Sequence, residues 1–240
     1  MTLRLLLLFA CAASQTIFGQ TNPIADWKHY CFGFLNAHPE RKEIPQTEAM
    51  EIQKGHMAHM GKMAEAGKLL VAGPFMTGAS PRGVVIYNCA TVAEAQANTA
   101  PDPAVVNKRL SMEFYRMRSV PGMGEPYATK AKADPKFQPA MVQFPFFILS
   151  KTDKLKTAPL PPAVGQAHFQ RSLKLMQEGK IRFFGRFEDS PEKLGVYVFN
   201  RMPMDEARKL IDEDDLVKNG FASVHAIMWM AADEAVPGFK

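Results

Sequence analysis

Apolar and polar positions along the chain predict an α+β protein in which one order of elements occurs twice. Residues 29–35 are aromatic-rich, which favours a strand. A helix is expected from Thr47, as its N-cap, to Ala66, with Gly67 as its stop. The other elements expected in this first set are strands at residues 69–72 and 83–89, a helix starting at 94–99 and a strand at 110–117.

The second set follows the same order further along the chain. Its elements are expected as a strand at residues 141–149, a helix ending at Glu178, strands at 180–184 and 195–200, a helix at 205–211 and a strand at 223–230. The order β-α-β-β-α-β is that of a ferredoxin-like unit. Such a unit covers one face of its sheet with helices and leaves the other needing a partner. We therefore expect the two sets to pack on each other as a pseudo-dimer within one chain.

The two sets also match residue for residue at an offset of 112. His56 corresponds to His168, Gly67 to Gly179 and Asp102 to Asp214 without a gap. Between residues 55–108 and 167–220, 14 of 54 positions are identical, where ordinary composition would give roughly three or four. The intervening residues 120–140 are rich in Pro, Gly, Ala and Lys, which predicts a linker.

The N-terminal residues 1–19 are typical of a secretory signal peptide, with Arg4 before a short apolar run. The run is shorter than the roughly 20 residues that a membrane-spanning helix needs. A lipid on Cys11 is the alternative use of this segment. We expect the protein to be periplasmic or secreted, with no membrane span. There a disulfide between Cys31 and Cys89 could persist, the alternative being two free, buried thiols.

Charge and motifs exclude several classes of function. The net charge is +5, and no Arg/Lys cluster is interleaved with aromatic residues, so nucleic acid is not expected as a partner. No phosphate-binding loop, zinc-ligand spacing or Gly-x-Ser-x-Gly element is present. The sequence indicates no cofactor and points to a small-molecule ligand, and it leaves a homo-oligomer open.

Three segments carry a resemblance to a known family. They are GHMAHMGKMAEAGKLLVAGPF at residues 55–75, RGVVIYNCATVAEAQ at 82–96 and DPAVVNKRLSMEF at 102–114. Together they closely resemble the YCII-related family. The first domain, residues 27–119, carries nearly the whole pattern. The second, residues 141–232, is divergent, because Gly185-Arg186 replaces Gly-Pro and Asp214-Asp215 replaces Asp-Pro.

The resemblance implies a dimeric α/β barrel built from two ferredoxin-like units. It also implies His/Asp active-site pairs, which would be His56 with Asp102 and His168 with Asp214. A carboxylate beside a histidine holds its tautomer and stabilises the imidazolium, which suits acid/base catalysis near neutral pH. Structural alternatives stay open: His56 could bond to the backbone, and Asp102 before Pro103 could simply cap a short helix. In the second domain, Asp215 makes the choice of matching carboxylate ambiguous.

Two further sets of residues are candidates. The loop at residues 73–82 could close over a pocket, where Thr77, Ser80 and Arg82 could bind a small anion, or it could be a plain surface loop. Metal binding is the rival chemistry, because copper would accept His and Met ligands on one helix face. Those residues are His56, His59, Met60 and Met63. The second set argues against a metal, since Arg171, Ser172 and Leu175 replace the last three.

The leading hypothesis is an exported small-molecule enzyme with a His/Asp pair. Its reaction is not in the sequence, although one relative in the family eliminates chloride from a chlorinated hydroxyquinone, which suggests lyase chemistry. The opposing hypothesis is a non-catalytic exported binding or scaffold module on the same fold.

Overall fold

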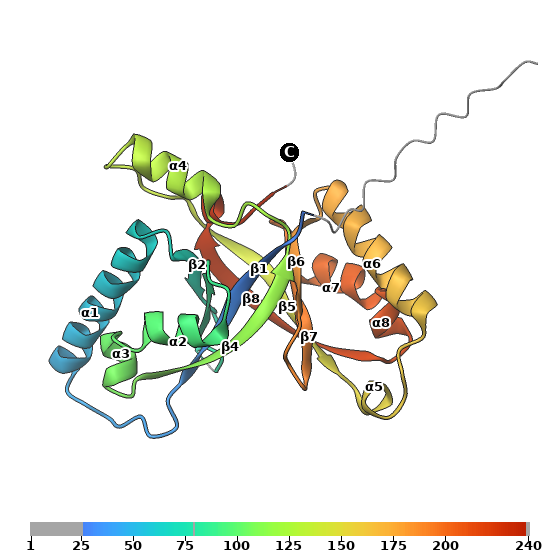
Figure 1. Cartoon of the computed structure of the whole chain (residues 1–240), viewed down its shortest axis with the longest axis horizontal. Helices are drawn as coiled ribbons and strands as arrows, with labels where there is room; N and C mark the ends of the chain where they lie inside the picture. The colour runs from blue at the N-terminus through green and yellow to red at the C-terminus, as the bar shows by residue number, and fades with distance from the viewer. Residues whose placement is uncertain (1–25, 79, 239–240) are drawn as a thin grey trace, which may run out of the picture.

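The first half of the structure is a four-stranded unit with its helices on one side. The computed structural model describes residues 26–78 and 80–238, so the expected signal peptide and Cys11 lie outside the described residues. In chain order the elements are β1 (Lys28–Ala37), α1 (Gln46–Glu65), β2 (Leu69–Pro74), β3 (Gly83–Tyr87), α2 (Val92–Thr99), α3 (Pro103–Val106) and β4 (Leu110–Ser119) (Figure 1).

The second half repeats this order after the helix α4 (Glu125–Ala133). Its elements are β5 (Met141–Lys151), α5 (Asp153–Thr157), α6 (Pro162–Gln177), β6 (Ile181–Phe187), β7 (Lys193–Phe199), α7 (Met204–Asp212), α8 (Asp215–Lys218), β8 (Ala222–Ala232) and the 3-10 turn η1 (Asp233–Ala235). The α1 and α6 helices both end at a glycine in the left-handed region, Gly67 (φ 67°) and Gly179 (φ 68°). Glycine adopts this conformation without a Cβ penalty, which explains why both stops are glycine.

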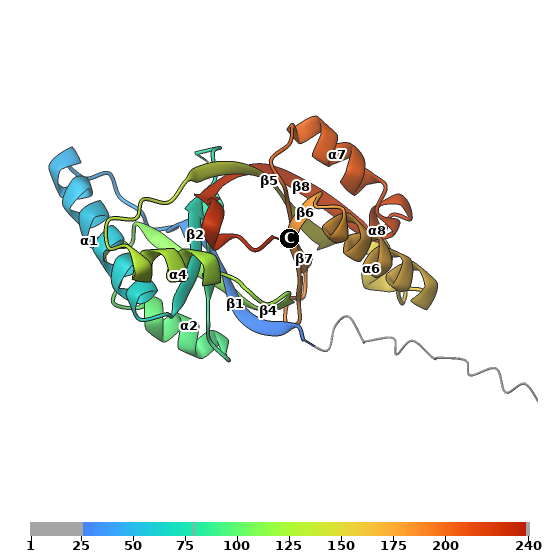
Figure 2. The ribbon, with the colours of Figure 1, turned by 90° about the horizontal axis from the view of Figure 1, so that it is seen from above.

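The eight strands form one antiparallel sheet in the order β2-β3-β1-β4-β6-β7-β5-β8. The halves join where Met117 of β4 pairs with Phe187 of β6. At the opposite side, Phe75 forms an isolated bridge with Trp229 of β8, so the sheet closes on itself. Viewed from above, the strands form a ring with helices outside it (Figure 2). The expected pseudo-dimeric α/β barrel is thereby confirmed.

Alternate residues of strand β1 belong to two different cores. Tyr30, Phe32 and Phe34 face the barrel interior and belong to the largest buried cluster, which in the second half also includes residues of α6 and α7. Cys31 and Leu35 face the helices and belong to a second cluster. This period of two is intrinsic to a strand, so an aromatic-rich strand fills the barrel while its other face packs under α1 and α2.

Residues 120–140 connect the two halves and contain the helix α4, which the sequence did not indicate; its Glu125–Ala133 segment is rich in the good helix formers Ala and Lys. Two local expectations were wrong. Helix α1 is capped by Pro45 without a side-chain hydrogen bond, and Thr47 lies inside the first turn. Cys31 and Cys89 form no disulfide and are two free, buried thiols, which was the alternative. The Cys31 thiol donates to the Thr91 carbonyl oxygen at 3.1 Å.

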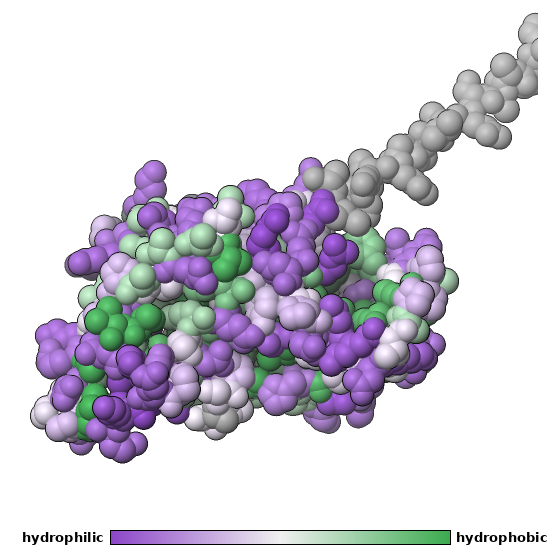
Figure 3. Space-filling model, turned by 60° about the horizontal axis from the view of Figure 1, so that its bottom comes forward, coloured by the Kyte–Doolittle hydropathy of each residue, from purple (hydrophilic) through white to green (hydrophobic). Residues whose placement is uncertain are grey.

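One face of the molecule has a mainly polar surface. On the face shown in Figure 3, hydrophilic residues predominate and hydrophobic ones form separate patches. Within the described residues, none of the helices has the length and apolar character needed to cross a membrane.

Candidate active site

Helix α1 brings His56 against the short helix α3. A Cβ on Gly55 would lie 2.8 Å from the Cγ atom of Pro103, so glycine permits this close approach. His56 is the buried residue of α1, with 7% of its surface exposed. In the second half, Ala167 and Asp215 occupy the places of Gly55 and Pro103.

Asp102 performs two tasks with its two carboxylate oxygens. Its Oδ1 accepts the backbone N–H of Ala104 at 2.8 Å and so caps α3. Its Oδ2 lies 2.7 Å from His56 Nδ1. An ionised carboxylate only accepts hydrogen bonds, so Nδ1–H is the donor and Nε2 carries the lone pair of the neutral ring. The capping alternative and the His/Asp pair are thus both present in the structure.

The carboxylate of Asp102 is buried beside Tyr87. Asp102 is 1% exposed. Burial raises the pKa of Tyr87, and the charge of Asp102 raises it further. Nε2 of His56 has no hydrogen-bond partner within the described residues, so this nitrogen is available to a ligand.

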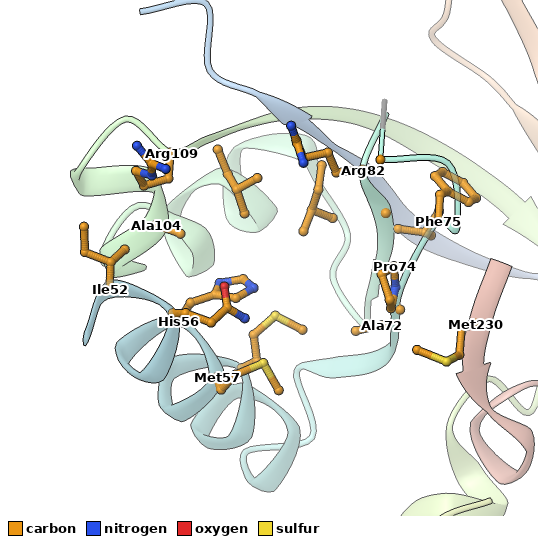
Figure 4. Close-up of a pocket in the computed structure, with 18 of the residues that line it drawn as sticks. Ile52, His56, Met57, Ala72, Pro74, Phe75, Arg82, Ala104, Arg109 and Met230 are labelled. Atoms are coloured by element: carbon orange, nitrogen blue, oxygen red, sulfur yellow. The ribbon is translucent and has the colours of Figure 1, made fainter. Parts of the chain in front are cut away.

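His56 lies in the wall of a cavity of about 720 Å³ (Figure 4). Its wall consists mostly of apolar residues from α1, β2 and β3, together with Met141 and Met230 from the other half. The charged residues of the wall are three arginines, Arg41, Arg82 and Arg109. No Asp or Glu is among the described residues that line it.

The three candidate residues of the loop do not all line the cavity. Arg82 lines the cavity, whereas Thr77 and Ser80 are exposed and are not in its wall. The Ser80 hydroxyl accepts the backbone N–H of Ala37 at 3.0 Å, which holds the loop to the end of β1. Sequence reasoning missed Arg41 and Arg109. Comparison of the two halves could have indicated Arg109, because the matching position at the offset of 112 holds an apolar residue, Phe221.

The second half contains a similar pair in a different setting. His168 Nδ1 lies 2.8 Å from Asp214 Oδ2, and Asp214 Oδ1 caps α8 through Leu216 N–H at 3.0 Å. This identifies Asp214, not Asp215, as the carboxylate that matches Asp102. Tyr197 packs edge-on against His168 with ring centroids 6.0 Å apart, where the first half has only Val85.

The residues considered as copper ligands do not converge. His56 bonds to Asp102, whereas His59 Nε2 donates to the Asn98 carbonyl oxygen at 2.9 Å. His59 is outside the cavity wall. Across the part of the chain that the structure describes, no group of three or more His, Cys, Asp or Glu residues could hold a metal ion.

Comparisons with known proteins support the fold. No family model and no curated protein sequence matches the chain. Among solved structures, a chlorite dismutase from Candidatus Nitrospira defluvii superposes with a TM-score of 0.54 and 12% identity, over 86% of this chain and 92% of that one. A heme-binding protein from Thermus thermophilus gives a TM-score of 0.50 and 17% identity, over 88% and 93%. The fold is a dimeric α+β barrel within one chain. At these identities the likeness shows the fold alone.

Proposed function

We propose that the protein is an enzyme that performs acid/base chemistry on a small molecule, with His56 as the catalytic residue. One observation carries this proposal: His56 lies in a cavity wall while its Nδ1 is held 2.7 Å from the Asp102 carboxylate. A histidine fixed in this way presents a basic Nε2 to the cavity, and the carboxylate stabilises the imidazolium that forms. Asp102 is a positioning residue in this scheme.

The His56/Asp102 pair in this cavity is suited to an elimination reaction. Nε2 would take a proton from a substrate carbon, the electrons of the broken C–H bond would form a C=C bond, and a leaving group on the adjacent carbon would depart with its bonding pair. The imidazolium could then donate its proton to the leaving group or to solvent. The apolar wall would exclude water from the reacting carbons, and Arg82 would bind a negatively charged part of the substrate.

The second pair serves a mainly structural role in this proposal. Tyr197 lies 3.4 Å from His168 Nε2 and also bonds to Ser172, so the ring nitrogen that is free in His56 has a protein neighbour here. Burial raises the pKa of Tyr197 well above its ordinary value, and the charge of Asp214 raises it further, so this hydroxyl stays protonated. We also propose that the chain is an exported, tandemly duplicated member of the YCII-related family, on the residues that resemble it.

Hydrogen exchange at substrate carbon tests the acid/base proposal without knowledge of the full reaction. A panel of 2-oxo and 2-hydroxy acids is incubated with the mature chain in D₂O, and loss of the C–H signal is followed by NMR. We expect catalysed exchange with at least one acid, a loss of about 100-fold or more in His56→Gln, and little change in His168→Gln. Equal losses in both variants would indicate two working sites. Exchange that survives His56→Gln, or no exchange with any acid, would favour the binding or scaffold module.

Haem binding is a second candidate, favoured by one feature of the same residue. Metal-ligating histidines usually donate their other N–H to a carboxylate or carbonyl, as His56 does to Asp102. His56 could hold the iron and the cavity arginines could bind the propionates. A bound haem would supply iron redox chemistry. Titration with hemin, followed by absorption, decides this: a sharp Soret band that His56→Ala abolishes supports haem, and an unchanged hemin spectrum excludes it.

A further inference from the structure

The charged part of the cavity wall is made by three arginines from separate segments. Arg41 lies between β1 and α1, Arg82 precedes β3, and Arg109 precedes β4. Figure 4 shows Arg82 and Arg109 at one end of the cavity, with His56 on α1 below them. None of the three forms a salt bridge within the described residues, although 15 pairs involving other residues are present there.

The protein itself only partly satisfies these guanidinium groups. Arg41 donates to the Arg109 carbonyl oxygen at 3.2 Å, and Arg109 donates to the Lys42 carbonyl oxygen. The Nε of Arg82 is buried without a hydrogen-bond partner in the structure. Desolvation lowers the pKa of Arg41, and the charges of Arg109 and Arg82 lower it further, so Arg41 lies within the field of the other two cations. Clustered like charges and an unpaired buried donor both cost free energy, which an anionic ligand would offset.

The second half provides an internal comparison, because it has apolar residues at all three places. At the offset of 112, Leu194 occupies the position that matches Arg82, and Phe221 occupies the position that matches Arg109. Arg41 corresponds to Leu155: the Arg41 N–H bonds to the His38 carbonyl oxygen as the Leu155 N–H bonds to that of Thr152. Leu155, Leu194 and Phe221 all pack in or against the main core. The fold therefore does not need cations here, so their presence in the first half calls for a ligand.

We infer that the cavity binds a small organic anion carrying two or more carboxylate groups, recognised by Arg41, Arg82 and Arg109. A guanidinium pairs with a carboxylate through two parallel N–H···O bonds, and one carboxylate would leave part of a three-arginine cluster unpaired. The apolar wall accommodates the carbon chain. The orientation of a carbon atom towards His56 rests on the proposed function, whereas the recognition of the carboxylates does not.

Calorimetric titration of the mature chain at fixed ionic strength tests this class of ligand. The probes are malonate, succinate, 2-oxoglutarate and citrate, with butyrate, 2-oxobutyrate and inorganic phosphate as comparisons. We expect at least one di- or tricarboxylate to bind about 10-fold or more tightly than either monocarboxylate. Arg82→Leu and Arg109→Phe should each weaken that binding by about 10-fold or more. These two substitutions introduce the residues that the second half has at the matching positions. If either variant does not fold, Arg82→Gln or Arg109→Gln is tested in its place.

Matched controls separate this inference from the proposed function. Arg208→Leu removes an arginine from the exposed face of α7 and should leave binding unchanged. His56→Gln should abolish carbon exchange yet keep carboxylate affinity within about threefold. Arginine-dependent binding without exchange would support the inference and refute the acid/base function. Four results would each overturn the inference. The di- and tricarboxylates could bind no more tightly than the monocarboxylates, or phosphate could bind as tightly as they do. The protein could bind hemin alone, or the carboxylate affinity could be unchanged in the arginine variants.

Discussion

The indole N–H of Trp229 donates to the carbonyl oxygen of Gly73 at 3.1 Å and so joins the last strand of the chain to the second. Next to this bond, the backbone N–H of Met76 donates to the Met228 carbonyl oxygen at 3.0 Å. These contacts close the barrel at the side opposite the β4–β6 pair. They also place Met230 of the second half in the wall of the cavity that contains His56. Closure of the barrel and completion of the candidate site therefore depend on the same junction.

A methyl group at Gly73 should open this junction. A Cβ there would lie 1.9 Å from the Met230 carbonyl oxygen and 2.9 Å from the Trp229 indole nitrogen. We expect Gly73→Ala to lower the free energy of unfolding by about 1 to 3 kcal/mol, as overpacking does. Gly61→Ala is the matched control, since nothing lies within 4 Å of a Cβ at that helical position. It should be neutral or stabilise by up to ~1 kcal/mol. Urea unfolding measures both, and equal effects would contradict the close-approach argument.

The first half alone should not behave as a stable monomer. Without its partner it would leave the β2 and β4 edges unpaired and expose interior residues such as Phe32, Phe34 and Phe75. Exposed edges and apolar faces promote association. Residues 20–119 should therefore be unfolded or self-associated in sedimentation experiments, with residues 20–240 as the reference. A folded, monomeric fragment would show that the two halves are independent.

The sequence predicted the architecture well because its signals are local. Alternating apolar residues, the glycine stops and the repeated order specify two ferredoxin-like units. Helix α4 was missed because Pro, Gly and Lys in residues 120–140 indicate a linker by composition, and its short helix has no buried residue to create an apolar period. Thr47 was wrongly chosen as N-cap because Pro45 begins the helix without a side-chain bond.

The site was predicted only in part because convergence of distant segments is not a local property. Asp102 was predicted as a site residue from the resemblance of its segment to the YCII-related family, and Pro103 beside it indicated a helix cap. The structure shows that the cap and the bond to His56 use different carboxylate oxygens of Asp102. Arg41 and Arg109 are single charged residues in loops, where cations are common and usually solvated. Only the fold shows that both reach the cavity that Arg82 lines.

The two tasks of Asp102 can be separated by substitution. Asn keeps an oxygen for the Ala104 N–H, but its NH₂ group would face His56 Nδ1 and favour the opposite tautomer. We expect Asp102→Asn to change stability by ~1 kcal/mol or less and to shift the ¹⁵N resonances of His56. Asp102→Ala should cost about 0.5 to 2 kcal/mol from the lost cap alone. Asp214→Asn serves as the control, since it should alter His168 and leave the His56 resonances unchanged. Unchanged His56 resonances in Asp102→Asn would show that the carboxylate does not set the tautomer.

The contact between Glu113 of β4 and Lys193 of β7 should make stability depend on acid pH. Lys193 Nζ lies 2.9 Å from Glu113 Oε1 and 2.9 Å from the Tyr115 hydroxyl. Burial alone would raise the pKa of Glu113, but hydrogen bonds from Tyr115 and Lys193 outweigh it and hold that pKa below the ordinary 4.5. A carboxyl group with a lowered folded-state pKa contributes stability above its unfolded value, and this contribution is lost as the pH falls through the folded value.

Wild-type protein should therefore lose urea resistance between about pH 5 and pH 3 more steeply than Glu113→Gln does, with 4.5 as the ordinary carboxyl pKa within that window. Glu192→Gln is the control. The pKa of Glu192 is also lowered, by a hydrogen bond from Lys156, but both side chains of this pair are exposed to solvent. Its effect should be small and should disappear in about 1 M salt, where the Debye length falls to about 3 Å. The half-buried Glu113 cluster should keep most of its pH dependence in the same salt, because Lys193 and Tyr115 contact the carboxylate directly. Identical acid profiles for wild type and Glu113→Gln would show that the folded state does not lower the pKa of Glu113.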